Sequence, residues 1–310
     1  MSAEPEKGQI LVLVDGSAGS RAAASAAVEI ARALGRPLAI LGVTGAGAAD
    51  ARIAEAVAQA RALATERVGA VDAIQSTGDV LEVARKRVSE TPTTLVILGA
   101  DPKPGHFLRL AGGHIWRVVR ALAPPVLIVP AGSAPPSKIL FCSGGERFTD
   151  EGARMVGRLA AGLGAPVVLL HVSPQIPEIY SGPLGRDASP EKFLESNSRL
   201  ARNLRRQLEI FRAAGAQVSF RLAWGDVADR VVEELRASAS DLLVVGSSPA
   251  RGGISAYVLG DVAREIAGRA GRAVLIVRPR QPGFWAELWR SLREGPAEEG
   301  PPATERPARG

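Results

Sequence analysis

The 310-residue chain is poor in cysteine, aromatic residues and histidine. Cys142 is the only cysteine, which excludes an internal disulfide bond and a metal site built from cysteines. Aromatic residues make up 4% of a chain that is 46% hydrophobic, so its cores must be aliphatic. The three histidines have no metal-binding spacing from nearby carboxylates, and we predict no metal site.

Long apolar runs are also missing from the sequence. No stretch reaches the roughly 18 apolar residues that suggest a membrane-spanning helix. Residues 1–7 lack the basic start and apolar core of a signal peptide. These absences predict a cytoplasmic protein with no membrane span.

The net charge of +6 is spread along the chain rather than concentrated in one run. In residues 199–212, for example, arginines alternate with apolar residues and one glutamate. No basic run is interleaved with aromatic residues, as a nucleic-acid surface would require. The pattern favours solvated helix faces and predicts no nucleic-acid partner.

The sequence repeats itself over most of its length. Gly78-Asp79-Val80 recurs as Gly225-Asp226-Val227, and residues 95–99 recur as residues 242–246, both 147 residues later. This period is too long for a solenoid and indicates a duplicated domain. We predict a first domain over residues 1–134, a second over 135–280, and an amphipathic helix with a disordered tail over 281–310.

Each repeat alternates short apolar runs with helical patterns, which predicts tandem open parallel-sheet α/β domains. In the first repeat we predict strands 10–14, 37–43, 71–76, 95–98 and 126–129, and helices 21–34, 50–68, 79–89 and 115–122. In the second we predict strands 138–142, 166–172, 217–222, 242–246 and 273–277, and helices 150–163, 190–214, 226–237 and 260–270. Asp50 and Asp79 are expected to cap the helices that they precede.

The last strands of the two repeats are expected to cover one another. Residues 126–129 and 274–277 are wholly apolar, and an uncovered apolar edge strand invites aggregation. Pairing them would make the chain an intramolecular pseudo-dimer, and the sequence leaves a homodimer open as well.

Ligands of open parallel sheets bind outside the carboxyl ends of the strands. There the first repeat carries Asp15-Gly16-Ser17 after its first strand and a glycine-rich loop after Gly99. These motifs, with the Gly-Asp before the third helix, resemble the universal stress protein family over residues 9–130 and 138–279. Members that bind ATP carry Gly-x2-Gly-x9-Gly-Ser/Thr after strand four.

The first repeat keeps part of that family pattern. Gly99 and Gly112 have the spacing of the first and third glycines, whereas Pro102 replaces the second glycine and Gly113 the hydroxyl residue. By the resemblance, Asp15 would face the adenosine end of ATP or AMP. The predicted nucleotide-binding residues are Asp15, Gly16, Ser17, Gly99, Gly105, Gly112 and Gly113.

The second repeat has lost more of the pattern. Pro249 again replaces a glycine, Gly260 arrives one residue late, and Asp261 occupies the hydroxyl position, where its charge would repel phosphate. Its opening turn offers at best Ser143 in place of Asp15. We therefore expect any nucleotide to bind in the first repeat alone.

The charged residues around the first glycine-rich loop allow two interpretations. Lys103, His106, Arg109 and His114 are either phosphate contacts or ordinary exposed loop residues. No Gly-x4-Gly-Lys-Ser/Thr motif is present, and neither repeat carries a set of nucleophile and base, so we predict no catalytic residues.

The resemblance implies a stress-response regulatory or binding protein with weak or vestigial adenine-nucleotide binding in the first domain. A nucleotide-free scaffold that binds a protein partner is the alternative. A slow ATP hydrolase fits least well, because no general base or metal ligand stands out in the sequence.

The tail is predicted to dock through an amphipathic helix. Phe284, Trp285, Leu288, Trp289 and Leu292 fall on one helical face, and the polar face mixes both charges, which favours packing on protein over a membrane surface. With the other two tryptophans replaced by phenylalanine, we expect blue-shifted, quencher-protected emission from the tail. Emission typical of water-exposed tryptophan would contradict docking.

Overall fold

The computed structural model describes residues 8–45, 50–101, 114–146, 149–173, 189–246, 248–249, 257–258 and 261–278. Residues 1–279 form one compact unit and residues 280–310 another. The predicted tail helix and disordered tail within 281–310 lie outside the described residues, and the fold below is that of the first unit.

The first repeat contains five strands and four helices within the described residues. Its strands are β1 (Gln9–Val14), β2 (Leu38–Thr44), β3 (Val71–Thr77), β4 (Thr93–Ala100) and β5 (Val126–Pro130). Its helices are α1 (Ala18–Leu34), α2 (Ala51–Thr65), α3 (Val80–Glu90) and α4 (His114–Ala121). Asp50 and Asp79 cap α2 and α3 through their carboxylates, as predicted.

The second repeat follows the same order of elements. Its strands are β6 (Ile139–Cys142), β7 (Val167–Ser173), β8 (Val218–Trp224), β9 (Leu242–Gly246) and β12 (Ala273–Val277), with the two-residue strands β10 (Ser248–Pro249) and β11 (Tyr257–Val258) forming a separate ribbon. Its helices are α5 (Asp150–Leu163), α6 (Pro190–Glu195), α7 (Arg199–Ala213), α8 (Val227–Ala237) and α9 (Asp261–Arg269).

The single helix predicted over 190–214 is wrong, because the structure has two helices there. α6 ends at Glu195, and Ser198 begins α7 by accepting a hydrogen bond from Ala201 N through its hydroxyl at 3.1 Å. Serine in this extended conformation is a strong N-cap and offers the backbone an alternative to continuing the helix.

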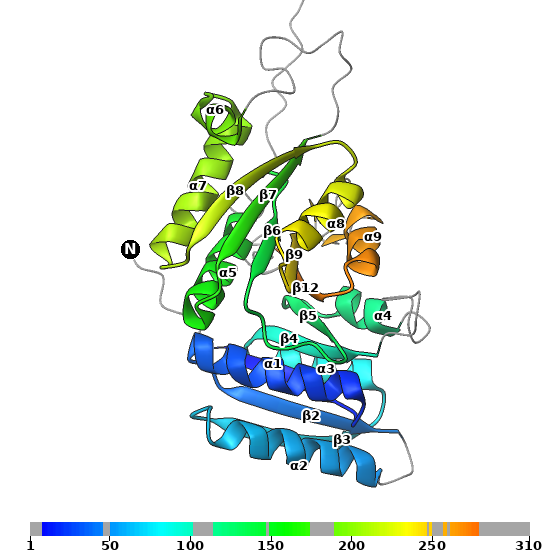
Figure 1. The fold of residues 1–310 in the computed structure, drawn as a ribbon. Helices are drawn as coiled ribbons and strands as arrows, with labels where there is room; N and C mark the ends of the chain where they lie inside the picture. The colour runs from blue at the N-terminus through cyan, green and yellow to red at the C-terminus, as the bar shows by residue number, and fades with distance from the viewer. Residues whose placement is uncertain are drawn as a thin grey trace, which may run out of the picture. The chain divides into compact units, whose positions relative to one another are not determined.

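The two repeats share one ten-stranded sheet, in the order β3-β2-β1-β4-β5-β12-β9-β6-β7-β8 (Figure 1). Eight of its neighbouring pairs are parallel, which confirms the predicted α/β class. β5 and β12 meet antiparallel, with Leu127 opposite Leu275, so the two apolar strands cover each other as expected. The domain boundary at residue 134 stays a prediction.

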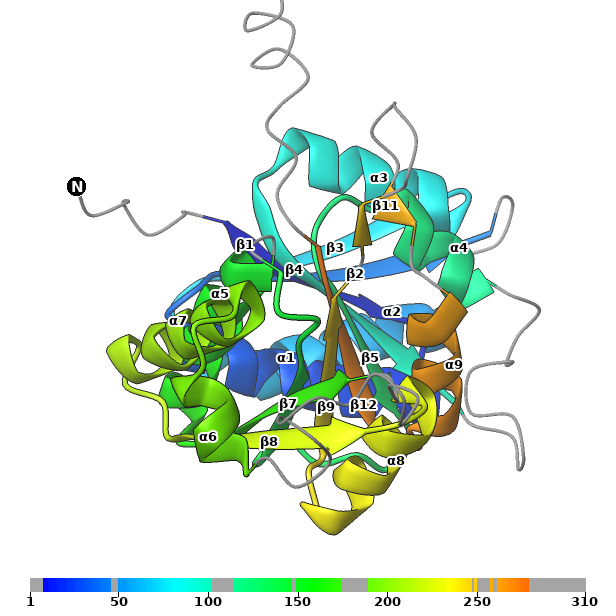
Figure 2. The same cartoon turned by 90° about the horizontal axis from the view of Figure 1, so that it is seen from above.

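Helices cover both faces of the sheet, and each face has one core that extends through both repeats. One core lies under α1, α2, α5 and α7, and the other under α3, α4, α8 and α9. Figure 2 shows α5 and α7 on one side of the central strands and α8 and α9 on the other. Strands buried on both faces explain the continuous Val, Ile and Leu runs of the sequence.

Contacts between the repeats occur on both faces. On one face, Gly162 of α5 lies against α1 so closely that a Cβ atom added to it would be 2.2 Å from Ala33 O. On the other, the guanidinium of Arg278 donates to Leu122 O at 2.9 Å and to Val119 O at the end of α4. Arg264 of α9 also lies over the ring of Trp116, 5.9 Å from its centroid.

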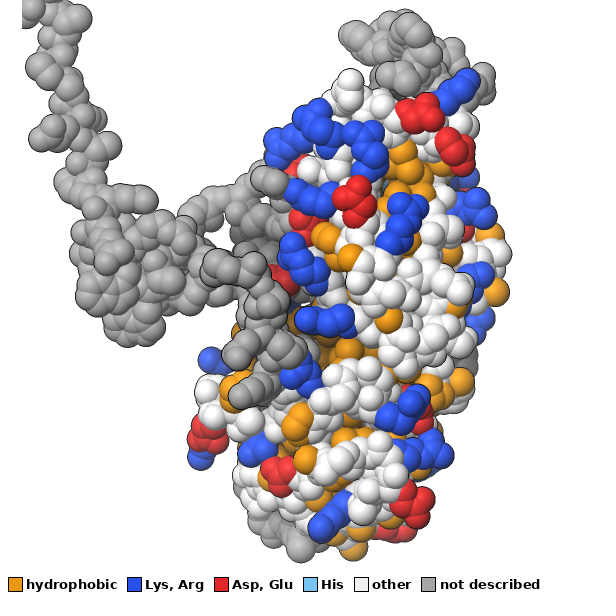
Figure 3. All heavy atoms as spheres, turned by 90° about the vertical axis from the view of Figure 1, so that its left-hand side faces the viewer, with side chains coloured by type: hydrophobic (Ala, Val, Ile, Leu, Met, Phe, Trp, Pro, Cys, Tyr) orange, Lys and Arg blue, Asp and Glu red, His pale blue; other side chains and the backbone are white. Residues whose placement is uncertain are grey.

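Arginines of α7 form ion pairs with nearby carboxylates, and Figure 3 shows basic and acidic side chains interspersed over one side of the molecule. Arg199 pairs with Glu146 at 3.5 Å and Arg206 with Asp150 at 2.7 Å. This mixed distribution is typical of a solvated surface.

The helix contact at Gly162 makes a testable prediction. We expect Gly162→Ala to lower the free energy of unfolding by about 1–3 kcal/mol, because the new methyl group overlaps the backbone of α1. Urea unfolding would measure it. Gly268→Ala in α9 is the matched control, since nothing lies within 4 Å of its Cβ position. Alanine there should stabilise by about 0.5–1 kcal/mol, and an equal effect of both substitutions would contradict the contact.

Candidate functional site

The carboxyl ends of β1 and β4 lie side by side, where the strand order reverses direction. A Cβ atom on Gly99 at the end of β4 would lie 2.3 Å from the carbonyl carbon of Gly19, and one on Gly19 would lie 2.7 Å from the backbone of Ala100. Two glycines therefore let the start of α1 touch the end of β4. Gly99 was predicted as a site residue and Gly19 was not, because its only signal in the sequence was its place just before the predicted helix 21–34.

The turn after β1 is held by its own side chains. Gly16 has a φ of +79°, which disfavours any other residue. The carboxylate Oδ1 of Asp15 accepts a hydrogen bond from Ser17 N at 2.9 Å. The hydroxyl of Ser17 accepts one from Ser20 N at 3.1 Å and so caps α1. All three residues of the predicted turn are thus fixed around the first turn of the helix.

Asp15 is exposed at this edge of the sheet and is held ionised. Partial burial opposes its ionisation, but hydrogen bonds from Ser17 and Ser20 and the positive charge of Arg52 outweigh it and lower the pKa of the carboxyl group. A carboxylate has about four acceptor sites. Asp15 therefore remains able to accept hydrogen bonds from a ligand.

A second carboxylate, which the sequence analysis missed, stands beside the same helix end. Asp101 follows β4 and its Oδ1 accepts a hydrogen bond from Gly19 N at 2.7 Å. The amino end of a helix attracts anions, and here a side chain already occupies one of its amide groups. The signal available in the sequence was an acidic residue directly after a buried strand.

The remaining predicted site residues cannot be placed. Gly105, Gly112 and Gly113 lie outside the described residues, as do Lys103, His106, Arg109 and Gly260. His114 and Asp261 begin α4 and α9, but their side chains also lie outside the description.

The strand register corrects the alignment of the two opening turns. Leu95 of β4 recurs as Leu242 of β9, and these residues pair with Ile10 and Ile139, so equivalent residues of β1 and β6 are 129 apart. Ser143 is then the equivalent of Val14, and Gly144 the equivalent of Asp15. The expectation that Ser143 replaces Asp15 is wrong by one residue, and the second repeat has no side chain at that position.

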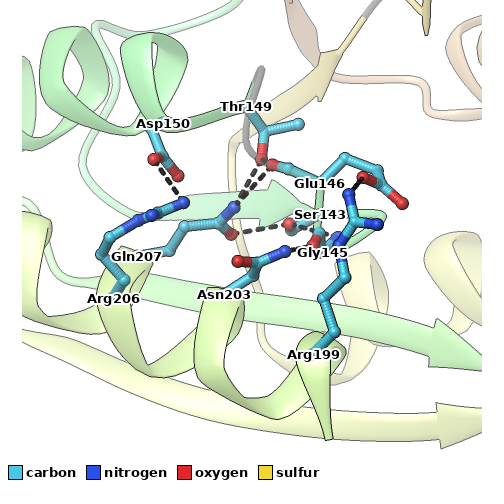
Figure 4. A network of polar contacts seen from close by, with 9 residues as sticks. All are labelled: Ser143, Gly145, Glu146, Thr149, Asp150, Arg199, Asn203, Arg206 and Gln207. Atoms are coloured by element: carbon cyan, nitrogen blue, oxygen red, sulfur yellow. Dashed lines mark hydrogen bonds and ion pairs between the residues drawn. The ribbon is translucent and has the colours of Figure 1, made fainter.

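A buried network fills the corresponding region of the second repeat (Figure 4). The amide of Gln207, which is 0% exposed, accepts from the Ser143 hydroxyl at 2.6 Å and donates to Thr149 Oγ1 at 2.5 Å. Asn203 Nδ2 donates to Gly145 O at 2.8 Å, and Ser143 Oγ accepts from Gly145 N at 3.0 Å. Two side chains of α7 thereby bind the turn after β6.

In this network, the polar groups of the turn in the second repeat already have hydrogen-bond partners within the protein. Its hydroxyl and amide groups are buried and hydrogen-bonded to one another, and removing one partner would leave another unsatisfied. The contrast with the exposed Asp15 turn is the main chemical difference between the repeats.

His171 of β7 extends the network inward. Its side chain is buried, its Nδ1 lies 2.8 Å from Ser143 O, and its ring stacks on Phe193 at 6.3 Å between centroids. Because the partner is a carbonyl, Nδ1 carries the proton and donates. Burial lowers the pKa of His171, against an opposing effect of that hydrogen bond.

Other chemistries find little support in the part of the chain that the structure describes. There, no three His, Cys, Asp or Glu side chains gather as a metal site, and no helix is long and apolar enough to cross a membrane. Burial, with the charge of Glu234, raises the pKa of Cys142 to about 12, which makes its thiol a poor nucleophile.

The buried histidine predicts a pH dependence of stability. The pKa of His171 is lowered in the folded state, so neutral His171 contributes its full share of stability above about pH 6.5, the usual pKa of histidine. This contribution is lost as the pH falls toward the lower pKa of the folded state. We expect the free energy of unfolding to drop between pH 7.5 and 5.5 by more in the wild type than in His171→Gln, by at most about 1.4 kcal/mol per pH unit. Urea titrations at both pH values would measure this, and equal losses would contradict it.

Comparisons with known proteins support this reading of the fold. The sequence model of the Universal stress protein family matches residues 136–278. The comparison with curated protein sequences found no significant match.

Two of the solved structures described next share the fold over most of the chain, and the third aligns with less than half of it. A universal stress protein from Archaeoglobus fulgidus DSM 4304 aligns with a TM-score of 0.66 and 14% identity, covering 88% of this chain and 99% of its own. A protein of unknown function from Pseudomonas aeruginosa PAO1 aligns with a TM-score of 0.59 and 19% identity, covering 94% and 97%. The universal stress protein from Archaeoglobus fulgidus in complex with dAMP covers 46% of this chain and 97% of its own, with 18% identity and a TM-score of 0.34.

The family match and the topology agree. The matched residues span β6 to β12, and β1 to β5 repeat the same strand order on the other side of the β5–β12 pair. Residues 136–278 therefore match the universal stress protein family, and the first repeat has the same fold as this matched part.

Proposed function

We propose that this protein is a stress-response binding protein that holds one adenine nucleotide, as ATP or AMP, in its first repeat. The ligand class is that of the dAMP complex named above, but the support in this chain comes from its own residues. The site consists of Asp15, Gly16 and Ser17 with Gly99, and we extend it to Gly105, Gly112 and Gly113 of the following loop.

The observation that carries the proposal is the exposed, ionised Asp15 at the carboxyl end of β1. Asp15 accepts a hydrogen bond from Ser17 N within its own turn, and its carboxylate is exposed at the surface. Ribose presents two neighbouring hydroxyl donors, which a carboxylate accepts well. The close approach of Gly19 and Gly99 brings the end of β4, which precedes the glycine-rich loop, against the start of α1, which follows Asp15.

The second repeat is proposed to bind no nucleotide. Gly144 stands at the position of Asp15, and the neighbouring polar groups are hydrogen-bonded to Asn203 and Gln207. In this repeat, buried hydrogen bonds take the place that ligand contacts would have. That observation favours a scaffold role for the second repeat beside nucleotide binding in the first.

Affinity for phosphate is expected to be low. Asp101 occupies an amide at the start of α1, Pro102 lacks an N–H group, and Gly113 lacks a hydroxyl. ATP should therefore bind little more tightly than AMP. We also propose that the protein is cytoplasmic and that its two repeats act as an intramolecular pair, on the basis of the sequence features given above.

Calorimetric titration of AMP and ATP tests the proposal. We expect one site per chain, and Asp15→Asn should weaken AMP binding about 10- to 100-fold, since a hydrogen bond to a charged group contributes about 1.5–3 kcal/mol. Asp226→Asn is the matched control, because Asp226 is an exposed carboxylate that also accepts from a nearby backbone amide, Asp229 N at 3.0 Å. It should leave AMP binding unchanged.

Two results would contradict the proposal. Two equivalent sites per chain would remove the asymmetry between the repeats. Unaltered AMP affinity in Asp15→Asn would remove Asp15 from the site.

A further inference from the structure

A small hollow lies between α1 and α2 in the first repeat, beside the proposed nucleotide site. Its volume is about 170 Å³. Its floor and walls are mostly apolar and include Val14, Ala56, Ala60 and Leu63, while Arg21 and Gln59 add polar groups. Asp15 is not among its lining residues, so the hollow is separate from the carboxylate that carries the nucleotide proposal.

The second repeat shows what occupies the same place there. Residues of β1 correspond to residues 129 further on, and the buried residues of α1 match those of α5 at the same offset. From β3 onward the offset is 147, because Leu38 pairs with Val71 and its equivalent Val167 pairs with Val218. With this offset, the buried residues of α2 also match those of α7. The lining of the hollow therefore corresponds to residues of the polar network in Figure 4.

Two alanines make the difference in volume. Ala56 and Ala60 correspond to Asn203 and Gln207, the two amides of α7 that reach the turn after β6. Val14 corresponds to Ser143, so the hydroxyl that binds Gln207 is replaced by an apolar side chain. The first repeat lacks both the amides and their partner, and a hollow with a mostly apolar lining lies in this place.

The charges around this space also differ between the repeats. In the second repeat, Arg206 pairs with Asp150 at 2.7 Å. The corresponding residues are Gln59 and Arg21, so a cation stands where the second repeat has a carboxylate. Arg21 donates to Gly16 O at 2.9 Å and forms no ion pair with any residue that the structure describes.

We propose that this hollow binds a small monocarboxylate with a compact apolar body, such as an aromatic or branched aliphatic acid. The apolar body would lie on Val14, Ala56 and Ala60, and the carboxylate would pair with Arg21. An engineered cavity of about 150 Å³ holds benzene, so a volume of about 170 Å³ takes one ring or a short branched chain. This site is independent of nucleotide binding.

Benzoate and its uncharged analogue benzamide are suitable probes. Backbone amide NMR of the full chain should show saturable shifts confined to residues 14–24 and 56–63 with both probes. Benzoate should bind at least fivefold more tightly than benzamide, and Arg21→Gln should abolish that preference while leaving benzamide binding unchanged.

Variants that place residues of the second repeat at the equivalent positions of the first test whether the probes bind in the hollow. Ala60→Gln places the equivalent of Gln207 in the hollow and should weaken both probes at least tenfold, and Ala56→Asn should act in the same direction. Ala62→Gln, on the exposed face of the same helix, is the matched control and should bind both probes as the wild type does. Circular dichroism would establish that each variant is folded.

The absence of saturable shifts in the wild type would overturn the proposal, as would unchanged binding in both Ala60→Gln and Ala56→Asn. Equal affinity for benzoate and benzamide would overturn the role of Arg21 and the carboxylate class. Adding AMP at saturation should not displace benzoate, and displacement would overturn the independence of the two sites.

Discussion

The antiparallel pairing of β5 and β12 is the constraint on which the rest of the fold depends. It joins two five-stranded parallel sheets into one, with Leu127 opposite Leu275 and every residue of both strands buried. Because the sheet is continuous, the helices on each face pack over one core that runs through both repeats. Hydrophobic burial then links the stability of one repeat to that of the other, and the contacts of Gly162 and Arg278 across the junction add to this link.

The turns after β1 and β6 have the same place in the two repeats but differ in their polar contacts. In the first repeat, glycines at positions 19 and 99 allow the backbones to touch, and the polar side chain of Asp15 is left at the surface. In the second, Asn203 and Gln207 of α7 form hydrogen bonds with Gly145 and Ser143 of the turn. Buried amides stabilise a structure only when their partners are all present. In the second repeat the polar groups of the turn are therefore hydrogen-bonded internally, whereas Asp15 of the first repeat stays exposed.

Much of the fold could be predicted from the sequence because its signals are local. Apolar runs such as 10–14 and 242–246 have the length of buried strands, and Asp50 and Asp79 stand directly before helical patterns whose amides they cap. The alternating pattern of 71–76 suggested an edge strand, and β3 is the last strand of the sheet. The break between α6 and α7 was missed, because Ser198 reads as one more tolerated polar residue unless its extended backbone conformation is known.

The sequence by itself determined the duplication, the class of each element and the chemical asymmetry between the repeats, because spacing, periodicity and residue type are properties of the chain alone. Only the tertiary structure decided which residues correspond and which meet. Strand register moved the equivalent of Asp15 from Ser143 to Gly144, and it brought Asp101 to the amide of Gly19, 82 residues away in the chain. The packing of α2 and α7 decided that the first repeat has a hollow and that side chains fill the same place in the second. Such packing depends on side chains that are far apart in the sequence, and no local sequence pattern shows that they meet.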